Sequence, residues 1–282
     1  MTILQALTLG IIQGITEFLP ISSSGHLIFV PHIFGWSDQG LTFDVIVHLG
    51  SLIAVVVYFR EILWRIVRAF FFAGGQTIPP SDGIPARGGT DNRQQDRKLG
   101  WLLLLSIIPA LITGLLFEVL DIEIRSPLVV AIGLIGWGIV LGIADKFSNQ
   151  KLVTSNQQSV TFGKALFIGC AQAVALIPGT SRSGITMTAG LFSKLSKKAA
   201  AEFSFLMSVP VIVIAGALKV VQFVKAGGEA IAFAPLVIGF FAAAASGYVA
   251  IWGLMKIIEK WSFMPFVVYR VAVGILILAF LV

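Results

Sequence analysis

The sequence QGITEFLPISSSGH, residues 13–26, carries the features that decide the fold of this chain. It lies between two apolar stretches and contains a proline followed by three serines and a glycine. A second stretch, QAVALIPGTSRSG at residues 172–184, repeats this plan, and in both the glutamine precedes the Ser-Gly glycine by twelve residues. Two polar, proline-broken stretches in matching halves of an apolar chain predict a binding site built from interrupted membrane helices.

The composition around these stretches is typical of an integral membrane protein. The 282 residues are 57% hydrophobic and only 12% charged, whereas soluble domains are about a quarter charged. Several apolar stretches approach or exceed the about 20 residues that cross a bilayer as a helix. Because these runs are continuous rather than alternating, they predict helices and not a β-barrel. We therefore expect an all-α fold in a single membrane domain, residues 1–282.

Each proline-broken stretch predicts a re-entrant helical hairpin, the first at residues 3–34 and the second at residues 162–193. A helix normally stops before a proline, and serine is a favoured N-cap for the helix that follows. The apolar arms are too short to cross a bilayer comfortably. Irregular backbone at membrane depth is tolerated only where it lines a cavity.

The remaining apolar stretches predict six membrane spans, three in each half of the chain. The first repeat, residues 1–146, and the second, residues 160–282, then each hold one hairpin and three spans. Because three is odd, the halves should be related as an inverted repeat, whose loop tips can meet near the middle of the membrane. The expected spans are 42–60 (with an amphipathic continuation over 64–72), 99–120, 127–144, 199–224, 232–258 and 263–282.

Basic residues orient this arrangement. Residues 60–98 hold seven Lys and Arg, and most of the other lysines fall on the same predicted side. The positive-inside rule places that side in the cytoplasm and both termini outside. The net charge of +6 is explained in the same way, so no nucleic-acid partner is expected. The sequence leaves the oligomeric state open, a homodimer being one option.

Glu17 lies in an otherwise apolar segment, where a carboxylate costs at least ~2.5 kcal/mol on insertion scales. It either reaches the interface from a helix end or serves as a metal ligand or acid–base group. The second interpretation is favoured, because intramembrane ionisable residues are usually functional. Gln13 lies one helical turn earlier on the same face, and its amide can donate and accept but carries no charge.

Hydroxyl and imidazole groups follow the break in the first stretch: Ser22, Ser23, Ser24 and His26. A serine and a histidine this close could be nucleophile and base, or they could bind phosphate. A serine-rich helix cap with a core histidine explains them equally well. Asp44 and His48 share one face of the next span. We favour a pair near the outer interface over membership of a polar cluster.

Arg182 is the strongest candidate ligand for an anion. It lies between Ser181 and Ser183 and follows Gly179, in a loop whose glycines let backbone N–H groups approach a phosphate. Arginine binds phosphate with two hydrogen bonds. An arginine that only extends to the interface is disfavoured in so tight a loop. Thr186, one turn further on, could add a hydroxyl.

The whole inventory suits phosphate chemistry on a lipid. Arg270, in the C-terminal apolar segment, either pairs with a buried acid or contacts the anion. Phosphoryl transfer needs positioning and charge neutralisation more than covalent machinery. No P-loop or His-Glu-x-x-His motif is present, which leaves ATP hydrolysis and zinc proteolysis unsupported. A hard cation, Mg²⁺ or Ca²⁺, held by Glu17 and phosphate oxygens suits these ligands.

The two motifs resemble those of the bacitracin-resistance family of undecaprenyl-diphosphatases. QGITEFLPISSSGHL fits that family's (Glu/Gln)-x-x-x-Glu segment with its following Ser-Ser-x-Gly-His, and PGTSRSGIT fits Pro-Gly-x-Ser-Arg-Ser-x-x-Thr. AEFSFLMSVP and FMPFVVYR are also similar, so the resemblance covers essentially the whole chain. It implies a multi-pass protein of the bacterial plasma (inner) membrane. The implied reaction hydrolyses undecaprenyl diphosphate to the monophosphate, with a divalent metal, and recycles the lipid carrier of cell-wall synthesis.

Carried over by position, the resemblance implies a catalytic set of Glu17, Ser23, His26 and Arg182. Gln13 stands where some members have glutamate, which leaves Glu17 as the only carboxylate of the motif. In our hypothesis Arg182 and its neighbouring serines hold the diphosphate, and Ser23 or a water attacks the terminal phosphorus. His26 handles the proton. A transporter or flippase of a phosphorylated lipid is the alternative, because broken helices in inverted repeats also build transporters.

Overall fold

The fold of the chain was analysed in a computed structural model that describes residues 1–71, 90–120, 124, 126–148, 159–225 and 233–282. The described residues form eleven helices and no strand, so the all-α prediction is confirmed. In chain order the helices are α1 (Ile3–Phe18), α2 (Ser23–Ile33), α3 (Gly40–Tyr58), α4 (Arg60–Phe71), α5 (Thr90–Val119), α6 (Pro127–Phe147), α7 (Phe162–Val174), α8 (Arg182–Phe192), α9 (Lys197–Lys225), α10 (Phe233–Ile257) and α11 (Met264–Phe280).

Four of the described helices, α5, α6, α9 and α10, are long and apolar enough to cross a membrane. A fifth span results if α3 and α4 are counted together. The remaining predicted span, 263–282, corresponds to α11, whose 17 residues are apolar but shorter. The coarse prediction of several membrane helices therefore holds, with fewer long spans than the six expected.

Two predicted boundaries need correction. The span expected over 42–60 does not continue straight into 64–72, because the chain bends by 81° between α3 and α4. A straight continuation would carry the charged residues Arg60, Glu61 and Arg68 into the apolar layer, where each costs several kcal/mol. The helix expected to start at residue 99 begins at Thr90, inside the stretch predicted as a polar loop. Residues 72–89 of that loop and 149–158 of the predicted linker lie outside the described residues.

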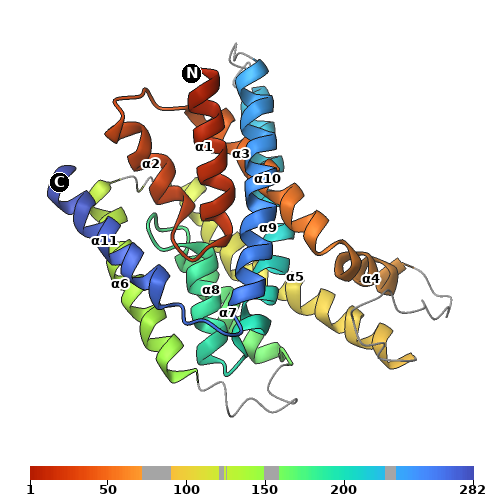
Figure 1. Cartoon of the computed structure of the whole chain (residues 1–282). Coiled ribbons are helices and arrows are strands. Elements are labelled where there is room, and N and C mark those ends of the chain that lie inside the picture. Colours follow the sequence, from red (N-terminus) through yellow and green to blue (C-terminus); the bar gives the residue numbers. More distant parts are fainter. Residues whose placement is uncertain (72–89, 121–123, 125, 149–158, 226–232) are drawn as a thin grey trace.

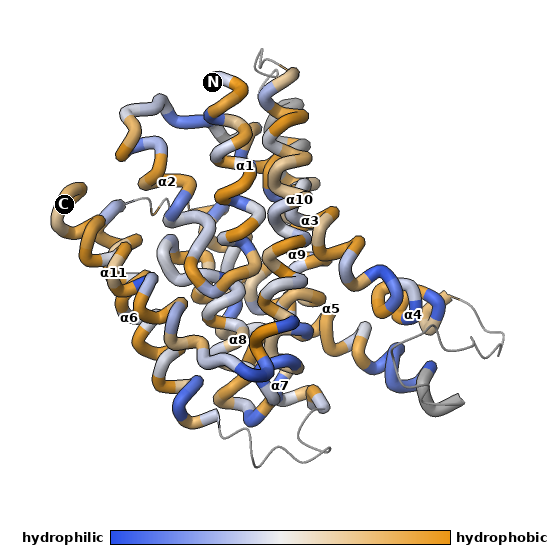
Figure 2. The backbone as a smooth tube through the Cα atoms, viewed as in Figure 1, coloured by the Kyte–Doolittle hydropathy of each residue, from blue (hydrophilic) through white to orange (hydrophobic). Residues whose placement is uncertain are grey.

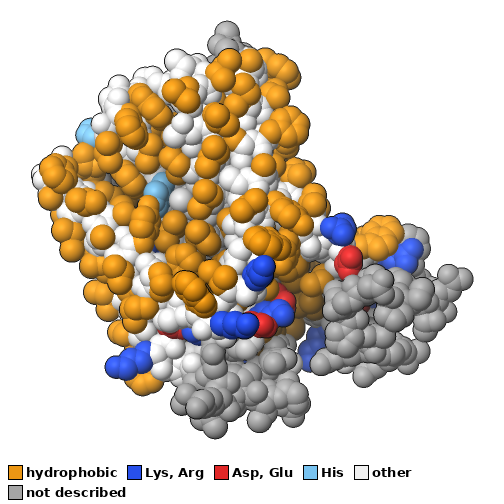
Figure 3. All heavy atoms as spheres, in the orientation of Figure 1, with side chains coloured by type: hydrophobic (Ala, Val, Ile, Leu, Met, Phe, Trp, Pro, Cys, Tyr) orange, Lys and Arg blue, Asp and Glu red, His pale blue; other side chains and the backbone are white. Residues whose placement is uncertain are grey.

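Most of the helical backbone carries hydrophobic residues (Figure 2), and the face drawn in Figure 3 is largely apolar. Large hydrophobic side chains such as Leu115 on α5, Phe241 on α10 and Val268 on α11 are more than 60% exposed. Contiguous exposed apolar surface of this kind is disfavoured in water and matches contact with lipid. Charged side chains gather instead at the lower edge of Figure 3 and near α4. This distribution is typical of a multi-pass membrane protein.

Ion pairs hold the charged end together. Lys197 Nζ lies 2.7 Å from Asp145 Oδ1, and Lys198 Nζ lies 3.1 Å from Glu259 Oε1. These contacts join the end of α6, the start of α9 and the residues after α10, so lysines that the sequence placed on one side do lie together. Both chain termini lie toward the other end of the molecule (Figure 1).

Glycines allow the first and tenth helices to pack closely. A Cβ on Gly10 would lie 2.5 Å from Gly239 O, and one on Gly14 would overlap Ala243 O and Ser246 Oγ. Small residues at such contacts let the backbones of membrane helices approach each other. This contact fixes α1, and with it Gln13 and Glu17, against the long helix α10.

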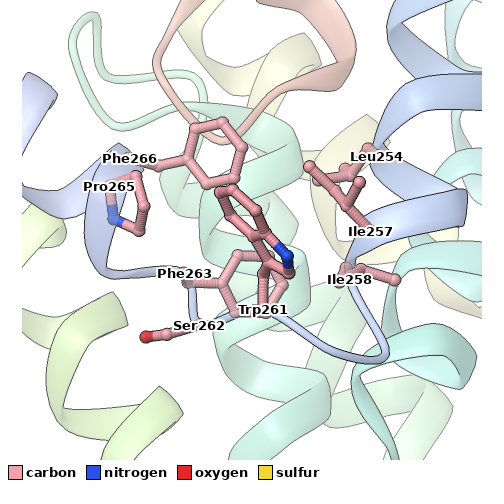
Figure 4. A pocket seen from close by; sticks show the side chains of 8 residues that line it. All are labelled: Leu254, Ile257, Ile258, Trp261, Ser262, Phe263, Pro265 and Phe266. Carbon is pink, nitrogen blue, oxygen red and sulfur yellow. The ribbon is translucent and has the colours of Figure 1, made fainter.

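An apolar cavity of about 100 Å³ lies where α10 ends and α11 begins (Figure 4). Its walls include Leu254, Trp261, Phe263 and Phe266. Ser262 is the one polar side chain among its lining residues. None of the residues predicted to carry chemistry lines this cavity, so the candidate site has to be sought elsewhere in the fold.

Candidate active site at the hairpin tips

The two proline-broken stretches fold into the same local structure. In each, a short helix ends before the proline and a serine N-cap starts the next helix, as the sequence pattern predicts. The caps, Ser22 and Ser181, both have a positive φ, of 77° and 69°. Each cap hydroxyl accepts a hydrogen bond from the backbone N–H of the glycine three residues on, Gly25 or Gly184.

This shared backbone is energetically unusual. A non-glycine residue outside the common φ regions costs about 1–3 kcal/mol, and such residues cluster at functional sites. Within each loop the cap serine also lies near a second serine, with Oγ–Oγ distances of 3.4 Å for Ser22 and Ser24 and 3.3 Å for Ser181 and Ser183. Ser23 and Arg182 then occupy equivalent positions, as the first residue of α2 and of α8.

An ion pair joins the two hairpins. The guanidinium of Arg182 donates from Nη2 to Glu17 Oε1 at 2.7 Å. The side chains are 14% and 8% exposed, so little water separates or screens them. Arg182 Nη1 also donates to the carbonyl of Ser204 on α9 at 3.4 Å. The carboxylate and the guanidinium predicted from separate motifs thus lie in one polar cluster.

The second oxygen of Glu17 collects donors from its own hairpin. Ser23 Oγ donates to Glu17 Oε2 at 2.6 Å, and Gln13 Nε2 donates to the same oxygen at 3.0 Å. Gln13 is fully buried, whereas Ser23 is only partly buried. Ser24, the next residue, is exposed. Ser23 therefore presents a hydroxyl that is bound to a carboxylate and still accessible at the edge of the cluster.

His48 also belongs to this cluster, which corrects the sequence interpretation. Its Nε2 lies 3.7 Å from Glu17 Oε2, and its Nδ1 is 2.6 Å from the carbonyl of Asp44. The favoured prediction paired Asp44 with His48 near the outer interface. The Asp44 carboxylate accepts a hydrogen bond from Gln39 Nε2 at 2.8 Å. Helical spacing placed the two on one face, but only the packing of α3 beside α1 brings His48 to Glu17. We call Gln13, Glu17, Ser23, His48 and Arg182 the Glu17 cluster.

His26 is held away from the Ser23 hydroxyl. Its Nδ1 lies 2.6 Å from the Ser22 carbonyl, and its Nε2 lies 2.6 Å from the hydroxyl of Tyr269 on α11. The two rings are stacked, with centroids 5.6 Å apart. The expected partnership of Ser23 with His26 is thus replaced by Ser23 with Glu17, because the Ser22 carbonyl turns the imidazole toward α11.

Tyr269 is a residue that the sequence analysis missed. It lies in the C-terminal motif FMPFVVYR, directly before Arg270, and its side chain is about 40% exposed. A hydroxyl in an apolar segment, next to a buried arginine, was the available signal. The Tyr269 hydroxyl has a hydrogen-bond partner in the structure. Here that partner is the one histidine of the first motif.

Arg270 is bonded to backbone carbonyls of both hairpin loops and of α6. It is fully buried, and its guanidinium donates to five backbone carbonyls. Two belong to α6, one to the first hairpin loop and two to the second: Leu134, Gly133, Pro20, Gly179 and Thr180. A guanidinium has five N–H donors and carries no acceptor. Arg270 therefore ties both loop tips to α6, and none of the ion pairs among the described residues includes it.

The other predicted ligands also hold the loops. Ser183 Oγ donates to the carbonyl of Leu19 at 3.0 Å, which is a second direct link between the hairpins. Thr186 Oγ1 lies 2.6 Å from Ser204 Oγ and is fully buried, on the side of α8 that faces α9. Gly179, with φ 85°, packs so closely on Val130 that a Cβ would overlap its backbone.

The donor set of the cluster fits a hard divalent cation. Gln13 Oε1 is buried without a hydrogen-bond partner, close to the carboxylate that its own amide nitrogen binds. Amide, carboxylate and hydroxyl oxygens are the ligands that Mg²⁺ and Ca²⁺ prefer. Among the described residues no three His, Cys, Asp or Glu side chains converge on one point. The residues therefore fit a cation that would share its ligands with a bound phosphate.

Comparison with known proteins shows which family the sequence matches. A family model described as Bacitracin resistance protein BacA matches residues 6–276. Undecaprenyl-diphosphatase 2 of Stutzerimonas stutzeri (strain A1501) is 44% identical over 279 residues, 99% of this chain and 98% of the relative. Undecaprenyl-diphosphatase 1 of Pseudoalteromonas translucida (strain TAC 125) is 44% identical over 282 residues, 100% of this chain and 99% of the relative. An undecaprenyl-diphosphatase of Campylobacter curvus (strain 525.92) is 43% identical over 279 residues, 99% and 98% of the two chains.

Proposed function

This chain belongs to the BacA family of bacitracin resistance proteins, and from that membership we propose that it is an undecaprenyl-diphosphatase. The reaction is the hydrolysis of a phosphoanhydride bond, from undecaprenyl diphosphate to undecaprenyl phosphate and inorganic phosphate. The observation that carries the site assignment is the contact of Glu17 with Ser23 on one side and Arg182 on the other. One carboxylate thus joins an accessible hydroxyl and an anion ligand from two distant motifs.

The proposal extends to the membrane setting. The hairpins α1–α2 and α7–α8 are re-entrant and enter from opposite faces of the bacterial plasma membrane, with the lysine-rich end in the cytoplasm. Their equivalent positive-φ caps support an inverted repeat. So does the packing, because α1 lies against α10 of the second half and α7 lies against α5 of the first. In this arrangement α3, α5, α6, α9, α10 and α11 are the six crossings.

Arg182 is the principal ligand of the diphosphate. It lies at the first position of α8, where the unpaired backbone N–H groups of a helix N-terminus also favour an anion. Its Nη1 hydrogen bond to Ser204 is long, at 3.4 Å, so this edge of the guanidinium can turn to a phosphate oxygen at little cost. A lipid at membrane depth keeps its polyprenyl tail in the bilayer while its diphosphate meets the cluster.

A divalent cation would be held by Glu17 and the free oxygen of Gln13. Arg182 is already paired with Glu17, so this ion pair has no net charge to balance a diphosphate. Two like charges about 4 Å apart repel by about 4 kcal/mol near a protein surface, and Glu17 would repel the substrate in this way. When bound, the cation supplies the missing positive charge and polarises the terminal phosphate.

Ser23 is placed to supply or activate the nucleophile. If Ser23 Oγ attacks the terminal phosphorus, its proton passes to Glu17 Oε2 and undecaprenyl phosphate leaves as the phosphoanhydride bond breaks. Water then hydrolyses the phosphoserine and releases phosphate. If a water attacks instead, Ser23 and Glu17 orient it and phosphate leaves in a single step. Ser22 and Tyr269 hold His26 away from the Ser23 hydroxyl. From that side of the loop His26 would handle a proton of the reaction.

The proposal is tested by phosphate release from undecaprenyl diphosphate in detergent, with and without Mg²⁺ or Ca²⁺. We expect metal-dependent release by the wild type and none by Ser23→Ala if the serine is the nucleophile. Residual release by Ser23→Ala would assign the attack to water. Ser51→Ala is the matched control, because this buried serine on α3 bonds only a helix carbonyl. Binding of the lipid without any release of phosphate would support the flippase alternative and overturn hydrolysis.

A further inference from the structure

Helix α4 is built unlike the rest of the fold. It follows an 81° bend and lies beside the bundle at the right of Figure 1. Its 12 residues include three arginines, yet it also carries Trp64 and Phe71 at its surface. A membrane span would not tolerate this charge, and a helix in water would not expose these aromatic rings. With 12 residues, α4 makes more than three turns, so one side can pack on the protein while the other side is exposed.

The exposed apolar residues of α4 form one stripe. Trp64, Val67 and Phe71 are 51%, 41% and 79% exposed, and their spacing of three and four places them on the same face. Ile66 and Ala69, by contrast, are buried against the protein. The exposed apolar stripe is therefore distinct from the face that packs on the fold.

The packed face fixes the direction in which the stripe points. Arg65 Nε lies 3.5 Å from Asp96 Oδ2 on α5, and the Phe70 ring lies edge-on to Trp101 with centroids 5.3 Å apart. Phe70 also covers Gly100 so closely that a Cβ there would overlap the ring. Because α4 is held to α5 by these contacts, its stripe cannot turn inward.

Positive charge surrounds the stripe. Arg68 lies over the Trp64 ring at 5.0 Å, and the only exposed carboxylate on α4, Glu61, is 3.9 Å from Arg60. That pair is 65% and 49% exposed, so it neutralises little of the field. The start of α5 adds three more exposed cations to the same corner: Arg93, Arg97 and Lys98.

We propose that α4 is an interfacial helix that binds the surface of an anionic phospholipid leaflet. Trp64, Val67 and Phe71 enter the boundary between head groups and acyl chains, and Arg60 and Arg68 contact phosphate groups of the lipids. Interfacial helices combine arginines with exposed Trp or Phe, and the long arginine side chains can extend to the lipid phosphates while the rings enter the apolar boundary. The bend between α3 and α4 then marks the cytoplasmic edge of the bilayer.

Depth measurements on the full-length protein test the geometry. Single cysteines at positions 61, 64, 67, 68 and 71, in a Cys170→Ala background, carry a spin label in nanodiscs of phosphatidylglycerol and phosphatidylcholine. We expect labels at 64, 67 and 71 to be accessible to oxygen and protected from a water-soluble nickel chelate, with the reverse at 61 and 68. Protection at all five positions would mean a buried span, and exposure at all five a helix in water. Either result overturns the proposal.

The preference for anionic lipid has its own test. We expect the label at position 67 to lie deeper in phosphatidylglycerol than in pure phosphatidylcholine. Each basic residue near an anionic surface contributes about fivefold to binding. Arg60→Gln with Arg68→Gln should therefore reduce the difference, whereas Lys146→Gln, on the exposed end of α6, should leave it unchanged. Equal depth in both lipids for the parent protein would refute the role of charge. Melting temperature and phosphate release report whether the variants remain folded.

Discussion

Glu17 Oε1 accepts a hydrogen bond from Arg182 Nη2 at 2.7 Å, although the two residues are 165 positions apart in the chain. Glu17 belongs to the first hairpin and Arg182 to the second. The two motifs are therefore in direct contact. Ser183 and Leu19 form a second direct link between the hairpins at 3.0 Å. The cluster exists only while both hairpins hold their positions.

Two substitutions of Arg182 distinguish the effect of its positive charge from the effect of its forked hydrogen bonds. Arg182→Ala removes the proposed anion ligand and leaves Glu17 without its cation. Charge-assisted hydrogen bonds contribute about 1.5–3 kcal/mol each, so the loss of two predicts a drop of roughly 100-fold or more in kcat/KM. Arg182→Lys should recover part of it, because lysine keeps the charge without the fork. Phosphate release measured for both variants decides this, and near-normal release by Arg182→Ala would exclude the anion-ligand role.

Gln13→Glu should strengthen the proposed metal site and destabilise the protein without metal. The side chain is buried 3.0 Å from Glu17 Oε2, so a second carboxylate adds like-charge repulsion there. A bound divalent cation would remove that repulsion. We expect a lower melting temperature than wild type in EDTA and a larger rise when Mg²⁺ is added. An unchanged response to Mg²⁺ would count against Gln13 and Glu17 as metal ligands.

Arg270→Lys should reduce stability more than substrate affinity. Lysine has three donors in place of five and cannot reach the carbonyls of both loops and α6 together. Leaving several buried carbonyls unpaired predicts a loss of more than about 3 kcal/mol. The melting temperature in detergent measures it, with the exposed Lys146→Ala as control. A normal melting temperature with a strongly raised KM would instead indicate that Arg270 binds the substrate.

Tyr269→Phe should slow turnover without unfolding the protein. The change removes the hydroxyl 2.6 Å from His26 Nε2 and keeps the stacked ring. The loss of one hydrogen bond of about 1 kcal/mol predicts a decrease in kcat of roughly fivefold. Tyr248→Phe, at a similarly exposed tyrosine, is the control. In a His26→Gln background the Tyr269 change should have no further effect; an equal effect in both backgrounds would show that the two residues act separately.

Gly14→Ala and Gly136→Ala should change stability in opposite directions. A Cβ at Gly14 would overlap the backbone of α10, whereas a Cβ at Gly136 meets no atom within 4 Å. Overpacking costs about 1–3 kcal/mol, while glycine to alanine in an open helix position gains about 0.5–1 kcal/mol. Melting temperatures of the two variants in the same detergent test this. A stabilising Gly14→Ala would mean that α1 and α10 are not packed as described.

Much of the helical architecture could be predicted from sequence because its causes are local. Proline stops a helix, serine caps the next one, and charge keeps a segment out of the apolar layer. These rules identified the breaks at Pro20 and Pro178 and the lysine-rich end of the molecule. They did not give the sharp bend between α3 and α4, because the charges after Phe59 mark where the apolar segment ends but not the direction that the chain then takes.

The composition of the site was decided by tertiary structure. Sequence spacing pointed to Glu17 and Arg182 separately, but their contact, and the arrival of His48, depend on how α1, α3 and α8 pack. Tyr269 and Arg270 are neighbours in sequence, yet one binds an imidazole and the other binds loop carbonyls. Hydrogen bonds within a helix depend on residues four apart, so the chain alone determines them. Contacts between side chains of distant segments depend on positions that only the packed fold defines.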